Sequence, residues 1–137
     1  MSEAKATGSC LCGAVHYTLE AAPVGTFACH CKDCQRQSGT AFSVIMGVPE
    51  SGVKVEGEPA TYLGRGDSGN AVQRKFCGKC GSPLFSIVEA TPGVLWIKTG
   101  TIDDTHSLNP QAHIWVKSKQ CWVDTGELPT FDTDPVL

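Results

Sequence analysis

Short runs in which apolar and polar residues alternate recur along the chain, and they predict β-strands. In residues 13–19, Val15, Tyr17 and Leu19 alternate with small or polar residues, which is the period of a strand with one buried face. Similar runs occupy residues 42–48, 53–55, 60–63, 71–76, 84–88, 94–99 and 113–116. Pieces typical of turns separate them, at 49–52, 57–59, 64–70 and 91–93. We therefore predict an all-β fold of roughly eight short antiparallel strands.

Helices have little room in this pattern. The 15 glycines and 8 prolines are spread along the chain, and both residue types disfavour long helices. Only residues 32–37 and 107–111 are expected to form a helical turn or two. A chain of 137 residues is long enough for one core. We expect a single domain over residues 1–137, with a core at about 8–131 and short tails.

Charge and hydrophobicity exclude several classes of function. The chain carries 11 Lys and Arg against 14 Asp and Glu, a net charge of -3, so no basic field favours nucleic acid or an anionic membrane surface. No segment approaches the ~18 apolar residues of a membrane span, and the N-terminal residues lack the apolar run of a signal peptide. We therefore expect a cytoplasmic protein that binds neither nucleic acid nor membrane. Nucleotide-binding and hydrolase motifs are absent from the sequence.

Cysteine is the unusual component, with 8 residues in the chain. In a reducing compartment, clustered thiols are more often metal ligands or catalytic groups than disulfides. The spacing also favours metal binding over a secreted disulfide framework, because seven of the eight cysteines fall into three groups. These groups are Cys10-x-Cys12, Cys29-x-Cys31-x-x-Cys34 and Cys77-x-x-Cys80.

The first and last groups are each typical of one half of a structural zinc site. Each forms a tight turn that offers two thiolates, and each has a glycine after its last cysteine, Gly13 or Gly81. Glycine tolerates positive φ there and lets backbone N–H groups approach the sulfur atoms. Four thiolates would close a tetrahedral Zn²⁺ site or, as the alternative, an iron site. The predicted ligands are Cys10, Cys12, Cys77 and Cys80.

The middle group has three cysteines within six residues and is expected to hold a second zinc ion. Three protein ligands with an open fourth position are the arrangement of catalytic zinc, where water or substrate completes the tetrahedron. A fourth protein ligand would close the site instead, with Cys121, His30 or Asp33 as candidates. In an extended segment the His30 side chain would point away from those of Cys29 and Cys31. Cys121 is expected to be an unpaired core cysteine.

Five strings of residues between Gly8 and Phe131 carry a resemblance to a known family. They are GSCLCGAVHY, ACHCKDCQRQSGTAF, FCGKCGSPLF, GTIDD and HIWVKSKQCWVDTGELPTF. In this order they resemble the glutathione-dependent formaldehyde-activating enzyme and centromere protein V family. The resemblance implies a β-tent fold built around two zinc ions, one structural at the four-cysteine group and one catalytic at the three-cysteine group. It also implies carbon–sulfur lyase chemistry that joins glutathione and formaldehyde into S-hydroxymethylglutathione, or reverses that step.

The open zinc position would bind the thiol of a small molecule such as glutathione and stabilise it as a thiolate. Lys32 and Arg36 flank the three-cysteine group and are candidates for contacts with substrate carboxylates. His30 or Asp33 is the candidate for moving a proton. The alternative is a zinc-stabilised binding module without turnover. The sequence leaves the oligomeric state open, with a homodimer as one option.

Two residues depart from the family pattern. Gln35 stands where arginine is common, and Cys121 stands where many members have proline. The chain is also shorter than the formaldehyde-activating enzymes proper, so segments that grip glutathione in them are expected to be missing here. These differences bear on the substrate and leave the predicted zinc ligands unaffected.

Overall fold

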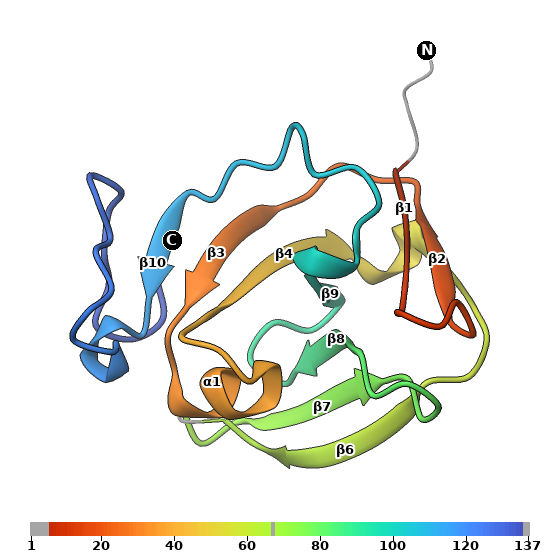
Figure 1. Ribbon diagram of the computed structural model, residues 1–137, viewed down its shortest axis with the longest axis horizontal. Helices are drawn as coiled ribbons and strands as arrows, with labels where there is room; N and C mark the ends of the chain where they lie inside the picture. The colour runs from red at the N-terminus through yellow and green to blue at the C-terminus, as the bar shows by residue number, and fades with distance from the viewer. Residues whose placement is uncertain (1–5, 67, 136–137) are drawn as a thin grey trace.

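The computed structural model describes residues 6–66 and 68–135 (Figure 1). This part of the chain consists mainly of strands, with one short α-helix, α1 (Lys32–Ser38). The strands are β1 (Ala6–Ser9), β2 (His16–Leu19), β3 (Gly25–Cys29), β4 (Ser43–Pro49), β5 (Val53–Glu56), β6 (Ala60–Arg65), β7 (Ala71–Phe76), β8 (Pro83–Val88), β9 (Val94–Lys98) and β10 (Ala112–Ile114). Short 3-10 helices follow β4, β9 and β10: η1 (Glu50–Gly52), η2 (Thr99–Thr101) and η3 (Val116–Ser118). The predicted all-β fold class is confirmed.

Two sheets contain these strands. One has the order β1-β2-β5, and the other has the order β10-β3-β4-β9-β8-β7-β6. Neighbouring strands are antiparallel, as predicted, except that β10 pairs with β3 in parallel. A parallel pair needs a long connection, and the chain from the end of β9 runs back alongside β3 before it enters β10 (Figure 1). The expectation of purely antiparallel strands is therefore wrong at this pair.

The two edges of the larger sheet differ. At the β10 edge, the C-terminal segment pairs with the strand: Phe131 donates its backbone N–H to the His113 carbonyl at 2.9 Å, and His113 donates to Pro129 at 3.0 Å. The Trp115 indole N–H reinforces this by donating to the Asp134 carboxylate at 2.7 Å. At the opposite edge, β6 is largely exposed and, among the described residues, pairs with β7 alone.

Most predicted elements correspond to observed ones, with four differences. Two strands have no counterpart in the prediction: β3 is buried at all five positions and so lacks alternation, and β1 has only small and polar residues. Residues 13–15 form a turn rather than the start of a strand. Helix α1 is where a helical turn was expected, but residues 107–111 contain no helix. None of the helices in the described part of the chain has the length and apolar character needed to cross a bilayer.

Two clusters of buried residues form the core, and each contains cysteines. The larger cluster joins the two sheets and includes Tyr17, Leu84, Ile97, Cys10 and Cys77. The smaller cluster lies where β10 meets β3 and includes Phe27, Ile114, Trp115, Cys29 and Cys31. The two predicted metal centres are therefore packed into different parts of the core.

Candidate functional site

Four cysteines that are far apart in the sequence meet at one point. The sulfur atoms of Cys10, Cys12, Cys77 and Cys80 all lie within 4.8 Å of one another. Cys12 Sγ lies 3.8 Å from Cys10 Sγ and 3.7 Å from Cys77 Sγ. Sulfur atoms at the corners of a tetrahedron around Zn²⁺ would be about 3.8 Å apart, given Zn–S distances of about 2.3 Å. The four donors thus fit one zinc ion.

The two halves of this group have the same backbone arrangement. Gly13 and Gly81 have φ angles of 82° and 83°, in the left-handed region that the sequence analysis predicts for them. Gly13 donates its N–H to the Cys10 carbonyl at 3.2 Å, and Gly81 donates to the Cys77 carbonyl at 2.8 Å. Each turn therefore closes on itself and presents two sulfur atoms on one side.

Hydrogen-bond donors also approach the sulfur atoms of the four-cysteine group. The Val15 backbone N–H donates to Cys10 Sγ at 3.3 Å. The Ser82 hydroxyl lies 3.2 Å from Cys80 Sγ and, with the Ser82 backbone, lowers the pKa of Cys80 to about 5. Donors of this kind stabilise the thiolate form that a metal ligand must adopt.

The three-cysteine group lies where β3 passes into α1. Cys29 ends β3, Cys31 is the N-cap of the helix, and Cys34 is in its first turn. Their sulfur atoms lie within 4.8 Å of one another. The Cys34 backbone N–H donates to Cys31 Sγ at 3.3 Å, so the sulfur replaces the oxygen of an ordinary N-cap. These three thiols can hold a second metal ion.

None of the candidates for a fourth ligand joins this group. His30 is fully buried, and its Nε2 lies 2.8 Å from His113 Nδ1 on β10. A carboxylate oxygen of Asp33 lies 3.8 Å from the Arg74 guanidinium. Cys121 is exposed, so the expectation that it is a core cysteine is wrong. Within residues 6–66 and 68–135, no His, Cys, Asp or Glu side chain completes the group to four.

The three thiols are coupled electrostatically. Hydrogen bonds from Cys29 and Cys31, together with the cations Lys98 and Arg74, lower the pKa of Cys34 to about 3 against the effect of burial. The same sulfur–sulfur hydrogen bonds raise the pKa of Cys29. As the pH rises, Cys34 is therefore the first of the three to become a thiolate.

Two buried cations adjoin the three-cysteine group, and neither was predicted from the sequence. Lys98 is 6% exposed and Arg74 is 9% exposed. The Lys98 ammonium donates to Ser43 Oγ at 2.9 Å. A signal for Arg74 is present in the sequence, since it falls in phase with Val72 and Phe76 on a strand. A cation at an apolar phase of a strand indicates a buried charge that needs a partner.

A cleft of about 400 Å³ lies between α1 and the strands β6 and β7. Three arginines line it, Arg36, Arg65 and Arg74, against the single carboxylate of Asp33. Tyr62 and Phe76 add apolar surface, and the remaining lining residues are Gln37, Gly81 and Pro83. The cleft is therefore basic, and it runs from the helix of the three-cysteine group to the turn that holds Cys80.

Lys32, the other residue expected to contact substrate, lies on a different side of the helix. It lines a shallow hollow with Gln120 and Trp122 and is not among the residues that line the arginine cleft. Arg36 borders both hollows. Of the two predicted substrate contacts, the structure places Arg36 alone beside the cleft.

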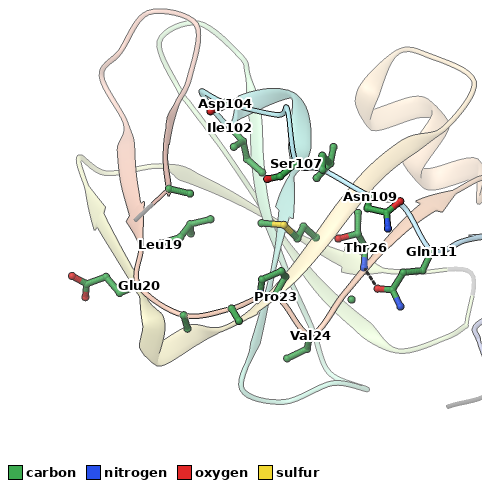
Figure 2. Close-up of a pocket in the computed structure, with 16 residues that line it drawn as sticks. Leu19, Glu20, Pro23, Val24, Thr26, Ile102, Asp104, Ser107, Asn109 and Gln111 are labelled. Carbon is green, nitrogen blue, oxygen red and sulfur yellow. Dashed lines mark hydrogen bonds between the residues drawn. The ribbon is translucent and has the colours of Figure 1, made fainter. Parts of the chain in front are cut away.

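A larger cavity, of about 1140 Å³, lies at the opposite end of β3 (Figure 2). Leu19, Met46, Ile102 and Leu108 give it apolar walls, and Asp104 adds a negative charge. No cysteine, histidine, lysine or arginine is among the described residues that line it. Its carboxylates, Glu20 and Asp104, belong to neither metal-binding group of the described residues, and it offers no cationic side chain to an anion. The cleft beside the three-cysteine group is therefore the candidate functional site.

Comparisons with known proteins indicate one family. The family model described as "Glutathione-dependent formaldehyde-activating enzyme" matches residues 5–118. A protein of Penicillium rubens is 34% identical over 80 residues, which cover 58% of this chain and 41% of that protein. One of Sordaria macrospora is 35% identical over 77 residues, which cover 56% of this chain and 32% of that protein. Both are provisionally named as glutathione-dependent formaldehyde-activating enzymes.

The chain spans less than half the length of these curated relatives. A solved structure of a Rhodobacter sphaeroides protein has a similar fold, with a TM-score of 0.59. The alignment covers 90% of this chain and 98% of that one, at 20% identity. At that identity the likeness concerns the fold alone.

Proposed function

The chain belongs to the glutathione-dependent formaldehyde-activating enzyme family, and from that premise we propose that it is a zinc-dependent carbon–sulfur lyase. Its substrate would be a glutathione-type thiol, which it would join to formaldehyde to form an S-hydroxymethyl adduct, or release from that adduct. The observation that carries the proposal is the group of three cysteines beside a basic cleft, with no fourth side-chain ligand among the described residues.

Two zinc ions per chain fit the donor sets. Thiolate sulfur is a soft ligand that suits zinc, and both groups bring their sulfur atoms close enough to share one ion. Zinc held by Cys29, Cys31 and Cys34 would supply a Lewis-acid position that favours the thiolate form of a substrate thiol. The four-cysteine group would hold the structural ion, which links β1 to the turn after β7.

The arginine cleft supports a thiol that carries carboxylates. Glutathione has two carboxylates, and arginine binds carboxylates through charge-assisted, often bidentate hydrogen bonds. Arg36 and Arg65 line the cleft and are more exposed than Arg74, so they are placed to meet a ligand that enters from solvent. Asp33 also lines the cleft, whereas His30 is fully buried and does not line it, so Asp33 is the better placed of the two proton-transfer candidates. A reducing compartment such as the cytoplasm would keep all these thiols free.

Replacing one ligand of the three-cysteine group tests the proposal. Cys31→Ser should lower the zinc content from two ions per chain to one and reduce adduct formation by at least about 10²-fold, while circular dichroism shows a folded protein. Cys121→Ser is the matched control, because this cysteine is exposed and belongs to neither group. It should retain both zinc ions and wild-type activity.

A thiol titration of the cobalt-substituted protein distinguishes the enzyme from a binding module. Glutathione should change the cobalt absorption spectrum of the wild type and leave that of Cys31→Ser unchanged, since only the former has a metal position for a thiol. A wild-type spectrum that does not respond to glutathione or to any other thiol tested would contradict the proposal and favour a module whose second zinc is closed by other ligands.

A further inference from the structure

The strand register of the larger sheet places Lys98 beside the three-cysteine group. Ser43 on β4 is the direct partner of Cys29 on β3, and Ile45 is the direct partner of Lys98 on β9. Directly paired residues point to the same face of a sheet, as do residues two apart on one strand. Cys29, Ser43 and Lys98 therefore share one face, and the bond from Lys98 Nζ to Ser43 Oγ brings the ammonium to the residue that adjoins Cys29.

Lys98 has no carboxylate partner among the described residues, although its side chain is buried. A buried ammonium is costly unless an opposite charge compensates it. Burial lowers the pKa of Lys98, and the negative charges of Cys34, Cys29 and Cys31 offset part of that effect. The fold therefore holds a cation whose compensating charges are the metal-binding thiolates.

The hydrogen bonds of Lys98 leave capacity for a ligand. An ammonium has three N–H donors, and the bond to Ser43 uses one of them. When a thiolate adds to a carbonyl, negative charge develops on the carbonyl oxygen, and a fixed donor in a buried site is the usual means of stabilising it. Arg74 is less suited to this role, because it is engaged with Asp33 and lines the cleft that would hold the rest of the thiol.

We propose that Lys98 is a catalytic residue whose ammonium donates a hydrogen bond to the carbonyl oxygen of the aldehyde, and to the hydroxymethyl oxygen in the reverse reaction. This assignment rests on the proposed function. The substrate thiol first gives its proton to Asp33, which passes it to solvent. A sulfur lone pair then forms the C–S bond while the C=O π pair moves onto oxygen, and that oxygen takes a proton from solvent. Lys98 stays protonated throughout, so the net reaction joins one thiol and one aldehyde.

The test compares Lys98→Met with Lys54→Met, in which an exposed lysine on β5 is replaced in the same way. Lys98→Met should keep two zinc ions and bind glutathione within about threefold of the wild-type affinity, while kcat for adduct formation falls by about 10²–10³-fold. Lys98→Arg should recover part of the loss, because it restores a cation, and Lys54→Met should match the wild type. Zinc analysis, glutathione calorimetry and steady-state kinetics give these values.

Formate provides a readout that does not depend on turnover, because its carboxylate imitates the oxyanion. Binding near the metal in the cobalt-loaded, glutathione-bound protein should broaden the ¹³C resonance of formate. The formate concentration that half-saturates this effect should be about tenfold lower for the wild type than for Lys98→Met. If Lys98→Met fails to fold, Ser43→Ala, which frees the ammonium without removing it, should still lower kcat and weaken formate binding.

The outcomes separate this assignment from the proposed function. Wild-type kcat and formate binding in Lys98→Met would overturn the role of Lys98 and leave the lyase proposal standing. A wild type that binds glutathione but forms no adduct would overturn both. Loss of zinc or of glutathione binding in a folded Lys98→Met would also overturn the assignment, because it would show that Lys98 supports the metal centre and not the carbonyl oxygen.

Discussion

His30 and His113 form a buried pair next to the three-cysteine group. His30 Nε2 lies 2.8 Å from His113 Nδ1, and Phe42 packs against the His30 ring at 4.9 Å between centroids. Burial, His113 and Lys119 lower the pKa of His30 to about 4. The pair links the segment between Cys29 and Cys31 to β10 through neutral rings, so at neutral pH it adds no charge to the group of thiolates.

The burial of His113 should make the stability of the protein depend on pH. Burial lowers the pKa of His113 below its ordinary value of about 6.5, so the unfolded chain binds a proton there more readily than the folded protein does. The free energy of unfolding should therefore decrease as the pH falls below about 6.5. Denaturant titrations at several pH values should show a shallower decrease for His113→Asn, whose amide can still meet His30. Parallel curves for the two proteins would contradict this expectation.

At the scale of residues, spacing predicted the cysteines but not the cations. Cys10 and Cys12, or Cys77 and Cys80, are recognisable because each pair lies within one turn. Lys98 is at the end of its strand, and it bonds to Ser43, the partner of Cys29, because β4 pairs with both β3 and β9. Strand order is set by the packing of the whole sheet, so a single sequence does not reveal which strands will be neighbours.

Helix α1 is only seven residues long, and its caps define its length. Cys31 accepts a hydrogen bond at the N-terminus, and Gly39 ends the helix with φ 69° while donating its N–H to the Gln35 carbonyl. A helix this short has little stability of its own. The geometry of Cys31 and Cys34 therefore depends on the caps and on packing against the sheet.

Gly39→Ala should lower the free energy of unfolding by about 1 kcal/mol, because alanine is strained at positive φ. A new Cβ would meet no atom within 4 Å, so the effect would come from the backbone conformation alone. Gly100→Ala is the matched control, since its Cβ also has open space and its φ is not positive. Chemical denaturation should separate the two variants, and equal stabilities would contradict the cap argument.

The elements that the sequence predicts well are those with one buried face. Alternation identifies β7 and β9 because their two faces differ in burial. It does not identify β3, which is buried along its whole length and runs directly into the cysteine motif. The parallel pairing of β10 is equally hidden, because it depends on the path of the connection after β9 and not on any local pattern.

At the scale of the whole molecule, the two metal centres differ in how much of the fold they connect. The four-cysteine group joins residues 65 positions apart, Cys12 and Cys77, and lies in the larger core cluster. The three-cysteine group is contained in one strand–helix junction and lies in the smaller cluster. Loss of the first centre should therefore affect the fold more than loss of the second.

Cys77→Ser should unfold the protein at 25 °C, whereas Cys31→Ser should not. Structural zinc contributes an apparent binding free energy of about 10–16 kcal/mol, which is comparable to the entire stability of a typical domain. Thermal unfolding followed by circular dichroism, with zinc analysis of each variant, checks this. A cooperative transition near the wild-type temperature in Cys77→Ser would show that the hydrophobic core alone maintains the fold.

The two unequal edges of the larger sheet determine where a strand from another molecule could be added. The β10 edge is already occupied by the chain's own residues 129–133, so a strand from another molecule would have to displace them. The β6 edge offers unpaired backbone groups, and β6 also carries Tyr62 and Arg65 of the basic cleft. An incoming strand that extends the sheet would therefore join it beside the entrance to that cleft, which couples any such assembly to substrate access.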